Sequence, residues 1–398
     1  MTTYLTVKSV LMAVAIMGAC GVFVARARRL ALLMKRVQGR SGAAPGRLRE
    51  RIKVLLTDVL GQSNVRRKRL PGIAHTLIFF GFLAVQPHSV ELMLRGVFPG
   101  LHMADLAPDL YGGYLFIADI LAFSVLFGLA YGLYRRIVIR PAYLPNGLDA
   151  RLIIAFIAVI IVTFHLLNAF LLLPAIGGTG FDTSRFLTVS KALGDTVGLT
   201  RLSAEAARAI YETSYWIHFL TILGFLVYIP GSKHLHMLAA APNVFLKPLV
   251  RPKPMIVTDL EAEGALSYGL GRASDLSWKS VLDLYACTEC GRCEEQCPAA
   301  MTGKPLSPRR VVHDAKVDLL RQSDAILNRS FKTIQPLVRE GAPITGDVIW
   351  SCTTCRACED ICPVNIQHLD LLLEIRKHLV LMEASFPPEM QDTFISLE

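Results

Sequence analysis

Five long apolar segments constrain this chain more than any other feature, because each can cross a hydrocarbon core of roughly 30 Å. They lie near residues 5–25, 71–93, 112–134, 151–173 and 211–230. A lipid core offers no hydrogen-bond partner to backbone N–H and C=O groups, so runs of this length predict helices. The mean hydropathy of +0.44 agrees. We therefore expect an all-α protein that opens with a five-helix transmembrane bundle.

The basic residues predict how this bundle is oriented. Fourteen Lys and Arg lie between Arg26 and Arg69, and the loop after the third segment carries Arg135, Arg136 and Arg140. The loops 95–111 and 174–210 are poor in basic residues. By the positive-inside rule, the N-terminus lies outside and the chain leaves its fifth segment into the cytoplasm, as a multi-pass protein of the inner membrane. Because the net charge of +10 is concentrated beside apolar segments, it favours a membrane and not a nucleic acid.

Eight of the nine cysteines form two copies of one motif in the last third of the chain. Residues 287–298 read Cys-Thr-Glu-Cys-Gly-Arg-Cys-Glu-Glu-Gln-Cys-Pro, and residues 352–363 read Cys-Thr-Thr-Cys-Arg-Ala-Cys-Glu-Asp-Ile-Cys-Pro. This is the spacing of two-cluster ferredoxins, including the closing proline. A zinc site more often uses separated Cys pairs, and disulfides are not expected in the cytoplasm. We expect two 4Fe–4S clusters.

The spacing also predicts which thiolates each cluster uses. Three closely spaced cysteines of one motif bind one cluster, and the fourth reaches the other cluster. Cluster 1 is expected to use Cys287, Cys290, Cys293 and Cys362. Cluster 2 is expected to use Cys352, Cys355, Cys358 and Cys297.

Histidines at two depths of the apolar segments are candidate axial ligands of b-type haem, one or two per chain. At the inner depth, His75 would pair with His236, or with His234. His236 is preferred because it lies eighteen residues after His218, five whole helical turns, and so shares its face. At the outer depth, His88 would pair with His218, and Pro87 is expected to re-aim His88.

Three further observations qualify the haem prediction. His165 in the fourth segment is a substitute outer ligand for His88. Asp119 in the third segment is a functional candidate or a hydrogen-bonded structural residue. For each histidine the alternative is a hydrogen-bonded role within the bundle.

The chain divides into four expected regions. Residues 1–238 are the transmembrane haem b domain, 239–280 a linker, 281–385 a ferredoxin-like domain with two 4Fe–4S clusters, and 386–398 a connection onward. Residues 311–320 and 366–383 show helical apolar periodicity, which predicts a helical ferredoxin domain. No Gly-rich dinucleotide motif follows an expected strand, so neither flavin nor nicotinamide binding is expected.

The chain resembles the membrane-bound iron–sulfur oxidoreductases related to heterodisulfide reductase, and above all electron-transfer-flavoprotein:(methyl)menaquinone oxidoreductases. The resemblance is carried by both Cys motifs, by Tyr-Trp-Ile-His at 215–218, by Ser-Lys-His-Leu-His-Met at 232–237 and by Pro-Asn-Val-Phe at 242–245. The membrane half is similar to the cytochrome b (gamma) subunit of respiratory nitrate reductase. The resemblance implies electron transfer from reduced electron-transfer flavoprotein, through clusters and haem, to menaquinone.

One departure from the family leaves two further readings open. Residues 386–398 look like the approach to a cysteine-rich domain that this sequence does not contain. Such a domain is expected on a longer chain or on a partner subunit. The alternative function is therefore an electron-conducting membrane subunit of a heterodisulfide- or sulfite-reductase-type complex, with substrate chemistry on a separate subunit. A redox-sensing membrane regulator is a third class. The residues identify neither the catalytic groups nor the quinone pocket.

Overall fold

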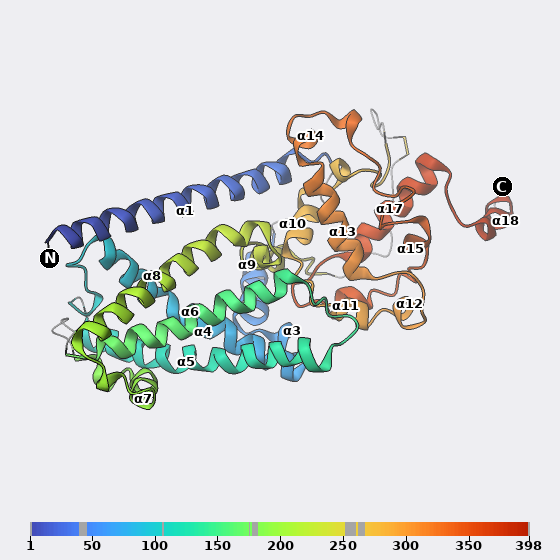
Figure 1. The fold of residues 1–398 in the computed structure, drawn as a ribbon. Helices are drawn as coiled ribbons and strands as arrows, with labels where there is room; N and C mark the ends of the chain where they lie inside the picture. The colour runs from blue at the N-terminus through green and yellow to red at the C-terminus, as the bar shows by residue number, and fades with distance from the viewer. Residues whose placement is uncertain are drawn as a thin grey trace. The chain divides into compact units, whose positions relative to one another are not determined.

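The computed structural model describes residues 2–39, 46–105, 107–174, 176, 182–250, 260–261 and 267–396. They form two compact units, which we describe separately (Figure 1). Unit 1 comprises residues 1–26, 65–141 and 146–230, and unit 2 comprises residues 27–64, 142–145 and 231–398. The described residues contain no β-strand, only two isolated β-bridges, so they agree with the expected helical class.

Unit 1 is a bundle of long apolar helices. Its helices are the first part of α1 (Thr2–Arg36), α4 (Arg69–Val97), α5 (Pro108–Tyr134), α6 (Leu148–Leu171), α7 (Thr188–Thr196) and α8 (Ala204–Tyr228), with α3 (Ser63–Arg66) at its edge. Among the described residues, five helices are long and apolar enough to cross a membrane: α1, α4, α5 with the π-helix η3 (Arg135–Ile139), α6, and α8. The structure therefore agrees with five apolar spans, and each helix begins before the expected segment, although α6 and α8 end two residues short of it.

The helix α6 is the centre of unit 1. In its most apolar window 56% of the residues are buried, against 6% for the corresponding window of α1. Ile153, Ile157, Ile160 and Phe164 follow one another at intervals of three or four residues, so they lie on one face and fill the core. The apolar surface of α1 is instead largely exposed, as suits a helix that faces lipid.

A tyrosine hydroxyl opens the backbone of α4 immediately after Pro87. In a regular helix the N–H of His88 would donate to the carbonyl of Ala84. Instead, it donates to the hydroxyl of Tyr114 (2.9 Å), and that hydroxyl donates to Ala84 O (2.7 Å). Insertion of a side chain into the hydrogen-bond ladder beside proline is a known cause of helix distortion. This departure from regular geometry lies at the residue whose side chain Pro87 was expected to re-aim.

Unit 2 is built from short helices joined by structured loops. They are α2 (Leu48–Val54), α9 (His236–Phe245), α10 (Trp278–Ala286), α11 (Arg292–Glu295), α12 (Pro298–Met301), α13 (Pro308–Arg321), α14 (Ser323–Leu327), α15 (Gly346–Trp350), α16 (Ala357–Asp360), α17 (His368–Glu383) and α18 (Gln391–Ile395). Sequence signals set several of these starts. Ser307 accepts a hydrogen bond from Arg310 N and precedes Pro308 at the first position of α13.

Unit 2 also includes residues that lie outside the expected ferredoxin region 281–385. Residues 27–64, from the expected membrane region, contribute Leu33 to its core. The expected linker 239–280 contains most of α9, whose Ala239 is buried in the same core, and the start of α10. Most of residues 251–266 lie outside the described part of the chain. The regions with periodic apolar residues at 311–320 and 366–383 coincide with α13 and α17.

Candidate metal centres

The first Cys motif places its thiols around the short helix α11. Cys287 ends α10, Cys293 lies within α11, and Cys297 precedes Pro298 at the start of α12. These three are buried, and Cys290 is partly exposed. Proline is well suited to the first position of a helix, so Pro298 ends the loop and begins α12 immediately after the fourth cysteine.

The second Cys motif repeats this arrangement around α16. Cys352 follows α15, Cys358 lies within α16, and Cys362 ends the motif. Cys358 and Cys362 are buried, Cys352 is partly buried and Cys355 is exposed. No disulfide joins any of the nine cysteines, all of which lie in the described part of the chain; Cys20 lies in α1.

The thiols expected for cluster 1 come together across the two motifs. A cavity in unit 2 is lined by Cys287, Cys290 and Cys293 from the first motif and by Cys362 from the second. Burial and these neighbouring thiols raise the pKa of Cys293 far above its usual range. Iron binding displaces the protons of such thiols and stabilises the thiolates that burial alone disfavours, so the donor set fits an iron–sulfur cluster.

The thiols expected for cluster 2 also lie together. Burial, the adjacent Glu359 and the nearby thiols of Cys352, Cys297 and Cys355 raise the pKa of Cys358. Among the described residues, no group of three His, Cys, Asp or Glu side chains is arranged around a single ion. A 4Fe–4S cluster binds one thiolate at each iron, so its ligands surround a volume and do not converge on one point.

The two cluster loops share one backbone conformation. Glu289 (φ 54°) and Thr354 (φ 57°) are left-handed at the same position of each motif, and so are Gly291 (φ 76°) and Arg356 (φ 62°) two residues later. Left-handed non-glycine residues are uncommon and cost conformational energy, so their repetition at equivalent positions indicates a loop shaped for its ligand. At Gly291 an added Cβ would lie 2.2 Å from Tyr143 O. Glycine is therefore required there by space, since Arg356 adopts a left-handed φ at the equivalent position of the second motif.

Backbone amides support both cysteine loops. Ile366 N donates to Cys362 Sγ and Thr354 N donates to Cys352 Sγ, each over 3.4 Å. Such N–H···S bonds stabilise negative charge on a cluster and help to set its reduction potential. Arg376 donates to Cys352 O (2.6 Å) and Ile349 O (2.8 Å), which holds the loop that carries Cys352.

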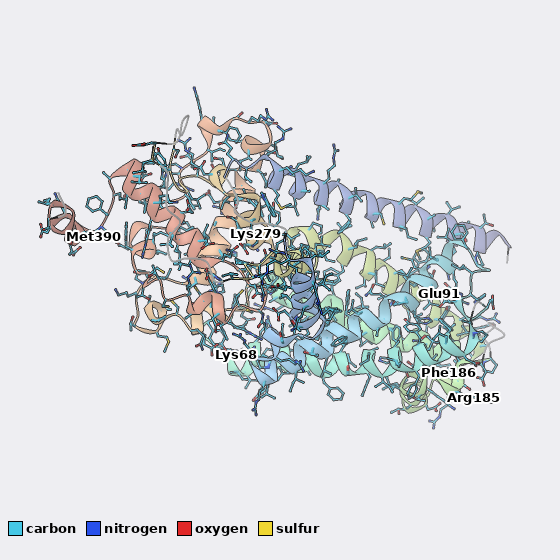
Figure 2. The ribbon with its side chains drawn as sticks, turned by 180° about the vertical axis from the view of Figure 1, so that it is seen from behind. Lys68, Glu91, Arg185, Phe186, Lys279 and Met390 are labelled. Atoms are coloured by element: carbon cyan, nitrogen blue, oxygen red, sulfur yellow. The ribbon has the colours of Figure 1, made fainter. Side chains whose placement is uncertain are left out.

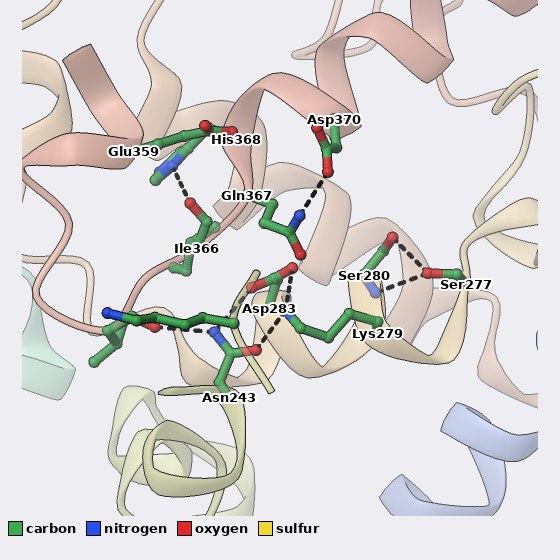
Figure 3. A network of polar contacts seen from close by, with 12 residues as sticks. Asn243, Ser277, Lys279, Ser280, Asp283, Glu359, Ile366, Gln367, His368 and Asp370 are labelled. Atoms are coloured by element: carbon green, nitrogen blue, oxygen red, sulfur yellow. Dashed lines mark hydrogen bonds and ion pairs between the residues drawn. The ribbon is translucent and has the colours of Figure 1, made fainter. Parts of the chain in front are cut away.

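A buried polar network lies beside the loop that follows Cys362 (Figure 3). Lys279 Nζ donates to Asp283 Oδ2 and to Asn243 Oδ1, both over 2.9 Å. Asn243 Nδ2 donates to Asp283 Oδ1 (2.8 Å) and to Val364 O (3.0 Å). The network thus joins α9, α10 and the residues next to Pro363. Sequence reasoning did not identify it, although Lys279 and Asp283 have the four-residue spacing of a helical ion pair.

The arginines of this region are mostly engaged within unit 2. Arg292 is buried and donates to Asn64 O (3.1 Å), Arg309 pairs with Glu294 (2.9 Å), and Arg356 pairs with Glu359 (3.2 Å). Only Arg310, of the four arginines in and near the Cys motifs, is exposed. Three of these arginines are thus held by contacts within the unit.

In unit 1, His88 belongs to a buried polar cluster. Its Nδ1 lies 2.9 Å from the hydroxyl of Tyr111 and 3.3 Å from Glu91 Oε2, and its Nε2 lies 2.8 Å from Asn168 Oδ1. Tyr111 also donates to Glu91, which is labelled within the bundle in Figure 2. Sequence reasoning missed Glu91, although a carboxylate in an apolar span, three residues after a histidine, was a visible signal.

His218 and His165 have different surroundings. Both ring nitrogens of His218 are hydrogen-bonded, Nδ1 to Thr163 Oγ1 (2.7 Å) and Nε2 to Ser89 Oγ (3.2 Å). His165 Nδ1 lies 2.9 Å from Ser190 Oγ and 3.3 Å from Asp119, whereas its buried Nε2 has no hydrogen-bond partner. Asp119 accepts from Val189 N (2.7 Å) near the start of α7, which gives this buried acid a structural role.

The expected inner haem ligands are divided between the units. His75 lies on α4 in unit 1, and His234 and His236 lie in unit 2. Their pairing stays a prediction. His236 Nδ1 lies 2.8 Å from Lys233 O. In this hydrogen bond Nδ1–H donates to the carbonyl, so Nε2 is the nitrogen with the free lone pair.

Comparison with known proteins identifies the nature of the second unit. Residues 283–366, which include all eight motif cysteines, match the 4Fe–4S dicluster domain family. Over 88% of its length the chain is 31% identical to a probable iron–sulfur-binding oxidoreductase, FadF, of Bacillus subtilis, and covers 53% of that protein. It is 26% identical to the EtfAB:quinone oxidoreductase of Syntrophomonas wolfei, over 85% of the chain and 50% of that enzyme.

A shorter relative belongs to a different enzyme complex. One of the subunits of the ferredoxin:CoB-CoM heterodisulfide reductase of Methanosarcina mazei is 33% identical over 24% of the chain and 46% of that relative. The chain spans about half the length of the curated relatives it matches. No solved structure was found to match it. The likeness to the nitrate reductase cytochrome b subunit has no counterpart among these relatives. The chain is thus related to iron–sulfur oxidoreductases, and its residues 283–366 form a 4Fe–4S dicluster domain.

Proposed function

We propose that this protein is a membrane-bound oxidoreductase that takes electrons from reduced electron-transfer flavoprotein and delivers them to menaquinone. The observation that carries this proposal is the convergence of Cys287, Cys290, Cys293 and Cys362 on one cavity. A dicluster domain on a chain with five membrane-length helices suits electron transfer between a water-soluble donor and a lipid-soluble acceptor. The name of the Syntrophomonas relative, an EtfAB:quinone oxidoreductase, supports a donor and an acceptor of this kind.

The residues around the clusters have defined tasks in this proposal. Two 4Fe–4S clusters, bound by the two sets of four cysteines, would supply one-electron storage. The backbone N–H groups of Ile366 and Thr354 favour the reduced form, because they donate to sulfurs that gain negative charge on reduction. Three of the four proposed ligands of cluster 1 are buried, Cys290 being the exception, whereas in cluster 2 only Cys358 and Cys297 are buried. By the charge distribution of the loops, this domain lies in the cytoplasm and the N-terminus outside.

Haem b is part of the proposal, and the local geometry supports some ligands better than others. A ligating histidine commonly donates its second ring N–H to a carbonyl or carboxylate. His236 meets this requirement through Lys233 O, and His165 through Asp119 and Ser190. His165 also keeps a buried Nε2 without a partner.

The ring nitrogens of His88 and His218 are occupied by hydrogen bonds within the bundle. We therefore favour His165 over His88 and His218 as the outer ligand. His236 is favoured over His234 at the inner position, where His75 remains the proposed partner.

The alternative is an electron-conducting membrane subunit whose substrate chemistry lies on a separate protein. The likeness to one component of a heterodisulfide reductase favours this reading. In this case the partner would be a cysteine-rich, heterodisulfide-reductase-like subunit or domain.

The decisive experiment follows flavin reoxidation in proteoliposomes. Chemically reduced electron-transfer flavoprotein and a menaquinone analogue are added to the full chain, to Cys362→Ser and to Cys20→Ser. Cys362→Ser should abolish quinone-dependent reoxidation, because Cys362, from the second motif, lines the cavity formed by the thiols of the first motif and is the proposed fourth ligand of cluster 1. Cys20→Ser is the matched control, because Cys20 is an exposed thiol far from both motifs in sequence.

Two results would decide against the proposal. Reoxidation that is unchanged by Cys362→Ser excludes the clusters from the route. Turnover only with a disulfide or another sulfur compound, together with a co-purifying cysteine-rich subunit, would establish the conducting subunit instead.

A further inference from the structure

A basic cavity lies in unit 1 between the end of α5 and the start of α6. Its volume is about 450 Å³, which is within the range of small-ligand sites. It is lined by Leu133, Arg136, Ile137, Arg140, Asn146 and Arg151. None of these residues belongs to the Cys motifs or to the histidine sites, so the cavity is independent of the proposed electron transfer.

The three arginines of the cavity lack acidic partners. Arg136 donates to Gly132 O (3.3 Å), Arg140 to Ile137 O (2.7 Å) and Arg151 to Asn146 O (3.4 Å), so each of these hydrogen bonds goes to a backbone carbonyl. No ion pair joins any of the three to a described Asp or Glu. In addition, the buried Nε of Arg136 has no hydrogen-bond partner. Three positive charges and an unsatisfied donor in one cavity call for an anion.

The backbone around the cavity is irregular in a way that presents these side chains together. After α5 the helix continues as the π-helix η3, which ends at Arg140 in the left-handed conformation (φ 47°). Short π-helical segments frequently occur at functional sites. Asn146 Nδ2 donates to Arg136 O (3.3 Å), which ties the loop before α6 back to η3. This bond joins the two sides of the cavity, one with Arg136 and Arg140 and the other with Arg151.

The surroundings of the cavity are apolar and exposed. Leu133, Ile137 and Leu148 have 41%, 53% and 69% of their surface exposed. They lie at the ends of two helices of membrane-spanning length. An acyl chain would cover such side chains, whereas a free inorganic anion would leave them in water.

We propose that this cavity binds the phosphate group of an anionic phospholipid. Guanidinium groups bind phosphate oxygens through paired, charge-assisted hydrogen bonds, and basic pockets between membrane helices are suited to lipid headgroups. Inorganic phosphate shares the headgroup chemistry but cannot use the apolar rim. The cavity would anchor the ends of α5 and α6 at the membrane surface.

Native mass spectrometry of the delipidated full chain in a neutral detergent tests this proposal. Phosphatidylglycerol, phosphatidylcholine and inorganic phosphate are titrated separately against the protein. Arg140→Gln/Arg151→Gln should raise the dissociation constant for phosphatidylglycerol about 30-fold. These two arginines are exposed, so the variant should fold even if Arg136→Gln does not.

The matched control, Arg185→Gln/Arg201→Gln, removes the same charge from exposed residues of unit 1 outside the cavity. Arg185 is labelled in Figure 2 and is 83% exposed. The control should bind phosphatidylglycerol like the unaltered protein. Loss of inorganic phosphate binding in the cavity variant, without a preference for phosphatidylglycerol, would assign the site to free phosphate. Equal lipid binding by both double variants, or equal binding of phosphatidylcholine and phosphatidylglycerol, would overturn the proposal.

Discussion

The buried pair Lys279–Asp283 offers a quantitative test of how the cluster domain is held together. Both side chains are at most 8% exposed, and the Nζ–Oδ2 distance is 2.9 Å. Removal of one partner leaves the other charge buried and unpaired, which costs about 3–5 kcal/mol, whereas replacement of both by apolar groups is often nearly neutral. We therefore expect Asp283→Leu to destabilise unit 2 strongly, and Lys279→Met/Asp283→Leu to recover most of the loss.

The loss of stability in Asp283→Leu is large enough to measure from the temperature at which the iron–sulfur absorbance is lost. In a unit of 150–250 residues, 1 kcal/mol shifts the unfolding temperature by about 2–4 °C, so Asp283→Leu should lower it by roughly 10 °C. The assay is anaerobic thermal bleaching of the iron–sulfur absorbance at a fixed heating rate. The matched control is Glu50→Gln, which breaks the exposed pair Arg47–Glu50 of the same unit and should shift the midpoint by about 2 °C or less.

The stability of the other single variant, Lys279→Met, should depend on pH in a direction that the pKa of Asp283 determines. Burial raises the pKa of Asp283, and Lys279 opposes this shift. In Lys279→Met the folded state keeps a proton on Asp283 that the unfolded state releases, so the variant loses stability as the pH rises. The reasoning is refuted if both single variants behave like Glu50→Gln, or if the double variant loses the sum of the two single losses.

Three further predictions concern the cluster loops, the partly buried ion pair Asp58–Lys247 and the bundle. Gly291→Ala should lower the iron content from about eight towards about four per chain, because the new Cβ would clash with Tyr143 O. Arg356→Ala, at the equivalent position of the second motif, should keep the full iron content. Equal iron contents in the two variants would contradict this prediction. Lys247 and Ser63 lower the pKa of Asp58 against the effect of burial. The stability that this ion pair contributes is therefore fully present well above the ordinary pKa of a carboxyl, and it is lost only as the pH falls through the lowered pKa. The difference in bleaching temperature between Asp58→Asn and the unaltered protein should therefore be constant from pH 5 to 8, and a slope would count against the pair. If haem is bound at the outer depth, His165→Ala should reduce its absorbance more than His88→Ala, and the opposite order would restore His88 as the ligand.

Local patterns were sufficient to predict the helical class and the presence of a 4Fe–4S dicluster domain. The length of the apolar runs predicted five membrane-length helices, because a lipid core leaves the backbone no other partner than itself. The spacing of the two Cys motifs predicted a dicluster domain, since three thiols within seven residues can reach three irons of one cluster. Both signals act over short stretches of sequence, so they do not depend on the rest of the fold.

Only the tertiary structure decided which distant residues meet. Tyr114 inserts beside Pro87, Asn243 reaches Val364, and Tyr143 leaves no space for a side chain at Gly291, although each pair is separated by 27 to 148 positions along the chain. Helical phase could place His88 or His165 on a face, but the hydrogen bonds to Asn168 and Asp119 depend on which helices pack together. A buried side chain is defined by its neighbours, and neighbours from other segments leave no periodic signal in the sequence.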